Sequence, residues 1–149
     1  MKSLFHQHDN QDIINRINKL SENTKPLWGK MTVSQMVAHA QNPLYVAFGE
    51  KKLKHGFIGV LFGKMAKKQL MGDAPFKRNL PTDKSFLVKD ERNFEIEKNR
   101  LIQLVQRFIT QGEAALTKEP HPFFGKLTTH EWDLLQWKHL DHHLRQFGA

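Results

Sequence analysis

No cysteine occurs among the 149 residues of this sequence. Its absence excludes a disulfide framework, thiolate zinc sites and cysteine nucleophiles, and it fits a reducing compartment. Long hydrophobic runs are also missing: no stretch approaches the roughly 20 apolar residues of a membrane-spanning helix, and the polar first residues show no signal-peptide core. We therefore expect a cytoplasmic protein with a single domain over residues 1–149, whose core draws on the 39% of residues that are hydrophobic.

Negative charge is scarce in one part of the chain. The formal net charge is +8 at pH 7, and residues 51–78 carry eight lysines and arginines against Asp73 alone, a net +7. This basic segment indicates an anionic small-molecule ligand or an acidic surface, with a solvated lysine face as the alternative. We do not expect nucleic-acid binding, because no recognition motif is present and Phe57 and Phe62 fit an apolar helix face better than a base-stacking platform.

Apolar residues recur at helical spacing in most of the chain, and strand signals are nearly absent. A first helix is expected to begin near Asp9 or Asn10, which are good N-cap residues. Thr32 followed by Gln35 forms a capping box, which predicts that a second helix begins at about Val33. Pro43 lies inside this helix, so we expect a kink or a restart there.

The second half of the chain predicts two more long helices. A short amphipathic segment over residues 57–65, whose exposed apolar side would suit a homodimer, is followed by a long irregular loop over residues 72–89. Asp90 is expected to cap a helix that ends at Gly112, and Thr128 opens the last helix with a second capping box. The expected fold is all-α: a four-helix bundle with an extra short helical segment and a long irregular loop.

The last helix carries the strongest chemical signal. His139 and His143 are four residues apart, which places both imidazoles on one helix face where they can share a metal ion. His142 lies on a nearby face and is the alternative partner. His39 is a third candidate, because it lies among apolar residues where an imidazole needs a partner. Three imidazoles suit zinc, nickel, iron or manganese, and the competing interpretation is that they are ordinary core or surface histidines.

The two histidine segments resemble a known family. Trp28-Gly29-Lys30-Met31-Thr32 with His39, together with His139-x-x-x-His143-x-x-Gln146, is similar to the DinB/YfiT-like metalloenzyme superfamily, in an uncharacterised branch. The resemblance implies a four-helix bundle whose divalent-metal site is the triad His39, His139 and His143. It also implies, for some relatives, thiol-dependent S-transferase or hydrolase activity. Since this chain has no cysteine, a thiol would have to enter as a small-molecule cosubstrate, attracted as an anion by the basic segment.

Four further residues are candidates for the surroundings of the site. Gln146 is expected to hold a metal-bound water, and Trp28 and Trp132 to wall the pocket or simply to fill the core. His121 either approaches the site from its proline-flanked loop or packs within that loop. Asp141 should face solvent. Two other functions stay open: a non-catalytic, metal-stabilised binding module, and binding of an anionic ligand or nucleic acid through the basic segment.

Overall fold

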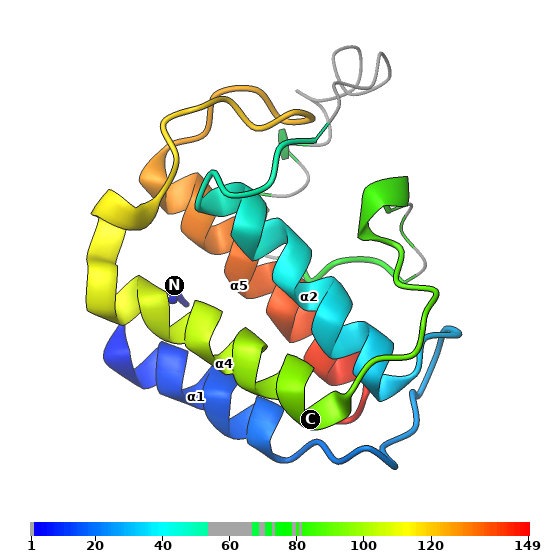
Figure 1. Cartoon of the computed structure of the whole chain (residues 1–149). Helices are drawn as coiled ribbons and strands as arrows, with labels where there is room; N and C mark the ends of the chain where they lie inside the picture. The colour runs from blue at the N-terminus through cyan, green and yellow to red at the C-terminus, as the bar shows by residue number, and fades with distance from the viewer. Residues whose placement is uncertain (1, 54–66, 69–70, 73, 79, 81) are drawn as a thin grey trace.

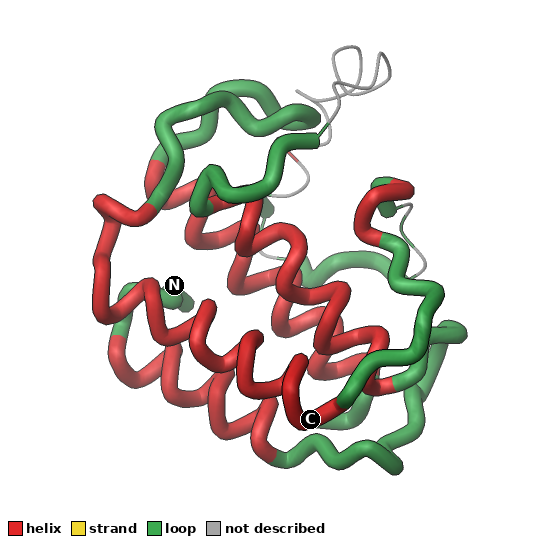
Figure 2. The backbone as a smooth tube through the Cα atoms, viewed as in Figure 1, coloured by secondary structure: helices red, strands yellow, loops and turns green. Residues whose placement is uncertain are grey.

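The structure is a computed structural model that describes residues 2–53, 67–68, 71–72, 74–78, 80 and 82–149. Within these residues the chain is all-helical, with four α-helices and no β-strand (Figures 1 and 2). The all-α prediction is therefore confirmed. The elements in chain order are α1 (Gln7–Asn18), α2 (Val33–Ala47), the 3₁₀ helix η1 (Lys84–Phe86), α4 (Phe94–Gln111), the 3₁₀ helix η2 (Gly112–Ala115) and α5 (Thr129–Gln146).

The four α-helices enclose one main core. α4 contacts both α1 and α2, and α5 contacts both α2 and α1 (Figure 1). Figure 1 shows α2 and α5 side by side and running in opposite directions. Each helix buries its apolar stripe in the centre, which removes that surface from water and stabilises the fold. The core includes Ile13, Ile17, Met36, Val37, Leu44, Leu101, Leu104, Phe108, Leu140 and Leu144.

The start of α1 differs from the prediction. The helix begins at Gln7, before the two residues that were expected to cap it. Asp9 instead accepts a hydrogen bond from the ammonium of Lys2 at 2.7 Å, and Asn10 donates to the carbonyl oxygen of Val105 in α4 at 2.8 Å. Both side chains are buried and fasten the start of the chain, so tertiary contacts rather than helix capping account for them.

α2 is one unbroken helix. The capping box predicted at Thr32 is present, with Gln35 as its second member. The predicted restart at Pro43 is wrong. Proline has no amide to offer the carbonyl of His39, and the Asn42 side chain donates to that carbonyl at 3.3 Å. This replacement bond satisfies the acceptor that Pro43 leaves free, so the helix continues to Ala47.

The later helix ends are set mostly by the residues that the sequence indicated. Asn93 rather than Asp90 caps α4, because its side-chain oxygen accepts from the amide of Ile96 at 3.0 Å. Gly112 ends α4 as predicted, with a φ of 61° that favours glycine. The capping box at Thr128 opens α5 and is confirmed.

Asp141 does not face solvent. It is 5% exposed and lies between two arginines, with Arg16 Nη1 of α1 and Arg145 Nε each 2.8 Å from its carboxylate. A charge so buried needs such partners. The triangle ties the C-terminal half of α5 to α1.

The connection between α2 and α4 is only partly described. The predicted amphipathic segment over residues 57–65 lies outside the described residues, and so does the dimer surface expected from it. The irregular loop predicted over residues 72–89 has no regular structure in its described part apart from η1. No helix in the described ranges is both long and apolar enough to cross a membrane.

Candidate metal centre

Three imidazoles meet in the seam between α2 and α5. The ligand nitrogens of His39, His139 and His143 all lie within 4.8 Å of one another. Their ring centroids are 4.6 to 5.3 Å apart. His39 comes from α2 and the other two from α5, so the cluster exists only when these helices pack. His142 is outside it, although its ring lies 5.2 Å from that of His143.

The backbone near η1 orients His39. Its Nδ1 lies 2.9 Å from the carbonyl oxygen of Phe86. A carbonyl only accepts, so Nδ1 carries the proton and Nε2 keeps its lone pair free. Ligating histidines in metal sites use this arrangement, in which the second nitrogen donates to a carbonyl or carboxylate and thereby sets the ring orientation.

Gln146 does the same for His143. Its side-chain amide donates to the carbonyl of Trp28 at 2.8 Å, which directs its oxygen to His143 Nδ1, also at 2.8 Å. His143 Nδ1 is therefore the protonated nitrogen and Nε2 is free. Gln146 thus orients His143, a role that the sequence did not indicate; its contact with a metal-bound water stays a prediction.

Gly29 lets this contact form. Its φ is 84°, and a Cβ at this position would lie 2.5 Å from the Gln146 amide nitrogen. Any side chain there would displace the glutamine. The Trp28-Gly29 motif therefore serves the site through its backbone: it leaves space for Gln146 and accepts its hydrogen bond.

His139 is the only one of the three without an orienting partner in the described structure. Its Nδ1 is buried and unbonded, and so are both amide atoms of Gln136, one helical turn earlier on the same face. Buried polar atoms in native proteins nearly always have a partner. The site thus contains unused hydrogen-bonding and coordinating capacity next to two imidazoles that are already oriented.

All three imidazoles are neutral at pH 7. Burial lowers the pKa of His39, and it lowers the pKa of His143 to about 3, with His39 adding to the effect. The pKa of His139 lies well below its usual range because of burial and the neighbouring His143 and His39. Neutral imidazole is the form that binds a metal, so no proton has to leave before an ion enters.

These donors fit a divalent ion. Three nitrogens within 4.8 Å can each reach a bonding distance of about 2.1 Å from one ion after shifts of no more than roughly 1 Å. Three imidazoles leave at least one coordination position open, as in catalytic rather than structural zinc sites. The orphaned nitrogen of His139 is also consistent with this ligand set.

Trp132 and His121 pack together, apart from this cluster. Trp132 is 2% exposed and belongs to a second apolar cluster with Val46 and Leu127. Its ring centroid lies 5.3 Å from that of His121, whose Nδ1 accepts from the amides that follow it in the turn. Burial lowers the pKa of His121 to about 4. The described contacts therefore assign both residues to packing.

Trp28 lies at the edge of the site with His142. The two rings are 5.9 Å apart in an edge-on arrangement, and the guanidinium of Arg78 lies 4.3 Å from the Trp28 ring centroid. Phe76 packs on the other side of His142, with ring centroids 6.1 Å apart. Phe76 thus contacts His142 directly, and Arg78 contacts the Trp28 ring beside it.

Three described cations of the basic segment have different partners. Lys51 bonds Asn42 and the carbonyl of Ser85, and Lys67 pairs with Glu131 at 2.8 Å. Arg78 stacks on a tryptophan near the histidines. These different partners indicate separate local roles for the three cations.

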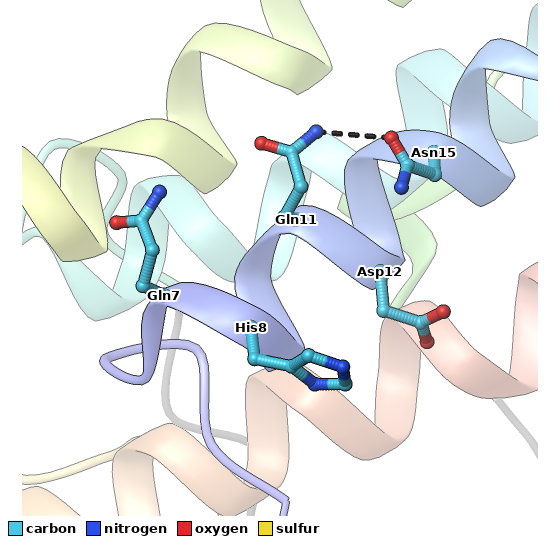
Figure 3. A pocket seen from close by; sticks show the side chains of 5 residues that line it. All are labelled: Gln7, His8, Gln11, Asp12 and Asn15. Atoms are coloured by element: carbon cyan, nitrogen blue, oxygen red, sulfur yellow. Dashed lines mark hydrogen bonds between the residues drawn. The ribbon is translucent and has the colours of Figure 1, made fainter.

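One surface hollow lies away from the histidines and is lined by ordinary polar side chains. A depression of about 330 Å³ follows the outer side of α1, lined by His8, Asp12 and three amide side chains (Figure 3). Gln11 and Asn15 bond each other across it at 2.9 Å. None of the histidine cluster lines this hollow, so it is not the entrance to the candidate metal centre.

Phe86 and Gly29 are the contributors that sequence reasoning missed. The carbonyl of Phe86 lies 47 residues along the chain from His39, and a backbone oxygen has no residue-type signature. Gly29 stood in the quoted motif, but only the position of Gln146 explains it. The sequence placed Gln136 on the same stripe of α5 as the histidines, but it could not indicate that the Gln136 amide is buried without a hydrogen-bond partner.

Comparison with known proteins gives one match. A family model described as "Protein of unknown function (DUF1569)" matches residues 2–149. No curated protein and no solved structure matches.

Proposed function

The chain belongs to the DUF1569 family, and we propose that it is a divalent-metal-dependent enzyme of the thiol-dependent S-transferase or hydrolase type. The proposed ligands are His39, His139 and His143. The observation that carries the proposal is the convergence of three neutral imidazoles from two helices, with ligand nitrogens within 4.8 Å of one another. Kinship with the DinB/YfiT-like superfamily is part of the same proposal.

The partners of the histidines support a site with fixed ligand directions. Phe86 and Gln146 each hold one imidazole by its Nδ1, so that neither ring has to be ordered when an ion arrives. Rings kept in place by neighbouring groups are typical of sites that perform chemistry.

A bound divalent ion would lower the pKa of a thiol or of water, which supplies a nucleophile at neutral pH. The protein's own residues then position the reactants. Trp28 and Phe76 pack against His142, the neighbour of His143, and Arg78 presents a positive charge on the Trp28 ring. An anionic thiol is therefore the cosubstrate class that this edge favours.

A non-catalytic, metal-stabilised binding module is the second candidate. The same three histidines would bind its metal, but no ligand at the ion would exchange with solvent or substrate. The three imidazoles favour the enzyme, because a triad leaves at least one coordination position open, as in catalytic zinc sites.

The proposal is tested by turnover. Untagged protein reconstituted with zinc, nickel, iron or manganese is mixed with small thiols and an activated electrophile, and thiol consumption is followed. We expect turnover that a chelator abolishes and that returning the metal restores. Stoichiometric metal binding without turnover, and without exchange of any ligand at the ion, would establish the binding module instead.

Gln146→Leu should weaken the binding of metal about tenfold or more while the helices stay folded, because His143 loses the group that orients it. Metal affinity is measured by competition with a chromogenic chelator. Gln103→Leu on the exposed side of α4 is the matched control and should bind as the native protein does. Equal affinities in all three proteins would show that Gln146 does not position a ligand.

A further inference from the structure

A second cavity lies on a different side of α2 from the histidine cluster. It has a volume of about 290 Å³, and its wall combines residues of α2, the stretch that includes η1, and α4. None of the three clustered histidines lines it. Asn42, Lys51, Arg92 and Arg100 are among the residues that line it.

The charged groups in this wall are unbalanced. Three cations, Lys51, Arg92 and Arg100, and one carboxylate, that of Glu97, line the wall. Asp90, which pairs with Arg92 from outside the wall, brings the net charge of the group to +1. Glu97 is 5% exposed, and it accepts from Gln41 at 2.8 Å and from Arg100 at 3.1 Å. Its charge is therefore already engaged at the base of the cavity.

Lys51 is the cation with the least compensation. Its ammonium donates to the side-chain oxygen of Asn42 at 2.6 Å and to the carbonyl of Ser85 at 3.0 Å, and both of these groups are neutral. No carboxylate among the described residues forms an ion pair with it. Burial lowers the pKa of Lys51, and the carboxylate of Asp83 partly offsets this effect.

The two arginines retain free donors. Arg100 uses one nitrogen for Glu97 and is half exposed. Arg92 pairs with Asp90 outside the cavity wall at 2.9 Å and lies 3.6 Å from Glu97. A guanidinium offers five N–H groups, so each arginine still has donors for an oxyanion.

We propose that this cavity binds the phosphate group of a small phosphate monoester. Its three peripheral oxygens can accept from the three cations that line the wall, Lys51, Arg92 and Arg100. A carboxylate has only two oxygens for these three cations. A volume of about 290 Å³ accommodates the phosphate and a small organic part but not a large ligand.

The inference does not depend on the proposed metal enzyme. The test therefore uses chelator-treated protein, and a His139→Ala variant beside it, so that coordination of phosphate to a metal cannot imitate the cavity. Inorganic phosphate, phenyl phosphate and benzoate are titrated by calorimetry. We expect saturable binding of one phenyl phosphate, weaker binding of inorganic phosphate, and benzoate weaker than phenyl phosphate by about tenfold or more.

Variants locate the site. Arg100→Gln and Arg92→Gln should each weaken binding of phenyl phosphate about tenfold, the loss of one charge-assisted hydrogen bond. Arg145→Gln is the matched control, because Arg145 is exposed to 56% and pairs with a carboxylate exposed to 7%, while the values for Arg100 and Glu97 are 55% and 7%. It should bind phenyl phosphate as the native protein does.

Several results would overturn the proposal. They are the absence of saturation, equal affinity for benzoate, and equal losses in the Arg145→Gln control. Loss of phosphate binding in His139→Ala would move the site to the metal centre. Vesicles of phosphatidylcholine with phosphatidic acid are the last arm: co-sedimentation that Arg100→Gln abolishes would assign the cavity to a lipid headgroup instead of a small soluble ester.

Discussion

Replacing His139 by alanine is expected to remove the divalent metal from the protein, from near one equivalent to almost none. Two imidazoles remain in that variant, and losing a ligand costs more than the 10- to 100-fold in affinity that is typical of losing a group that only orients one. His39→Ala and His143→Ala should behave in the same way, since all three nitrogens belong to one cluster. Metal content is measured by mass spectrometry on untagged protein.

His142→Ala is the matched control for this experiment. It removes an imidazole from the same helix, next to His143, but one outside the cluster. Metal content should stay near one equivalent. If His142→Ala lost the metal and His143→Ala kept it, the ligand assignment on α5 would be wrong. Native protein that takes up none of zinc, nickel, iron or manganese would overturn the proposed function and leave the cavity between α2 and α4 untouched.

Acidification is expected to destabilise the metal-free protein strongly. Below pH 6.5 the unfolded chain takes up protons on its histidines, whereas the buried ones in the folded protein do not. The folded-state pKa values are about 4 for His121 and about 3 for His143, and that of His139 is also well below the ordinary value. The stability that these residues contribute is therefore complete above pH 6.5 and is lost as the pH falls toward 4 and 3.

The size of this effect follows from the pKa differences. Each buried neutral histidine costs about 1.4 kcal/mol for every pH unit below 6.5, so three of them reduce the free energy of unfolding by roughly 4 kcal/mol between pH 7 and pH 5.5. Urea unfolding in the presence of a chelator measures it. His121→Gln should make the pH dependence less steep, and His8→Gln, at an exposed position, should not. An unfolding free energy that is flat over this range would show that the histidines are not held neutral.

Local sequence signals predicted the helices well where the deciding group lies within one turn. Both capping boxes, at Thr32 and Thr128, formed as predicted, because a cap involves residues only three positions apart. Two of the predictions that failed concern acidic side chains with ionic partners. Asp9 and Asp141 were expected at a cap and in solvent, and each is instead buried against a cation, Lys2 for Asp9 and Arg16 of α1 for Asp141.

The candidate site divides in the same way. Spacing placed His139 and His143 on one face, because an α-helix repeats every 3.6 residues whatever surrounds it. That His39 joins them required the packing of α2 on α5. The groups that orient these rings lie farther away in the chain still: Phe86 is 47 residues from His39, and Trp28 is 118 residues from Gln146.

By itself, the sequence determined the all-helical class, most helix ends, the histidine pair of the last helix and the charge of the chain, because these depend on neighbours within a few residues or on composition alone. Only the tertiary structure decided that a third imidazole meets the pair, which nitrogen of His39 and His143 carries the proton, and that Lys51, Arg92 and Arg100 share a cavity. Those properties depend on backbone carbonyls and on charges brought together from distant segments, and a carbonyl looks the same at every position of a sequence.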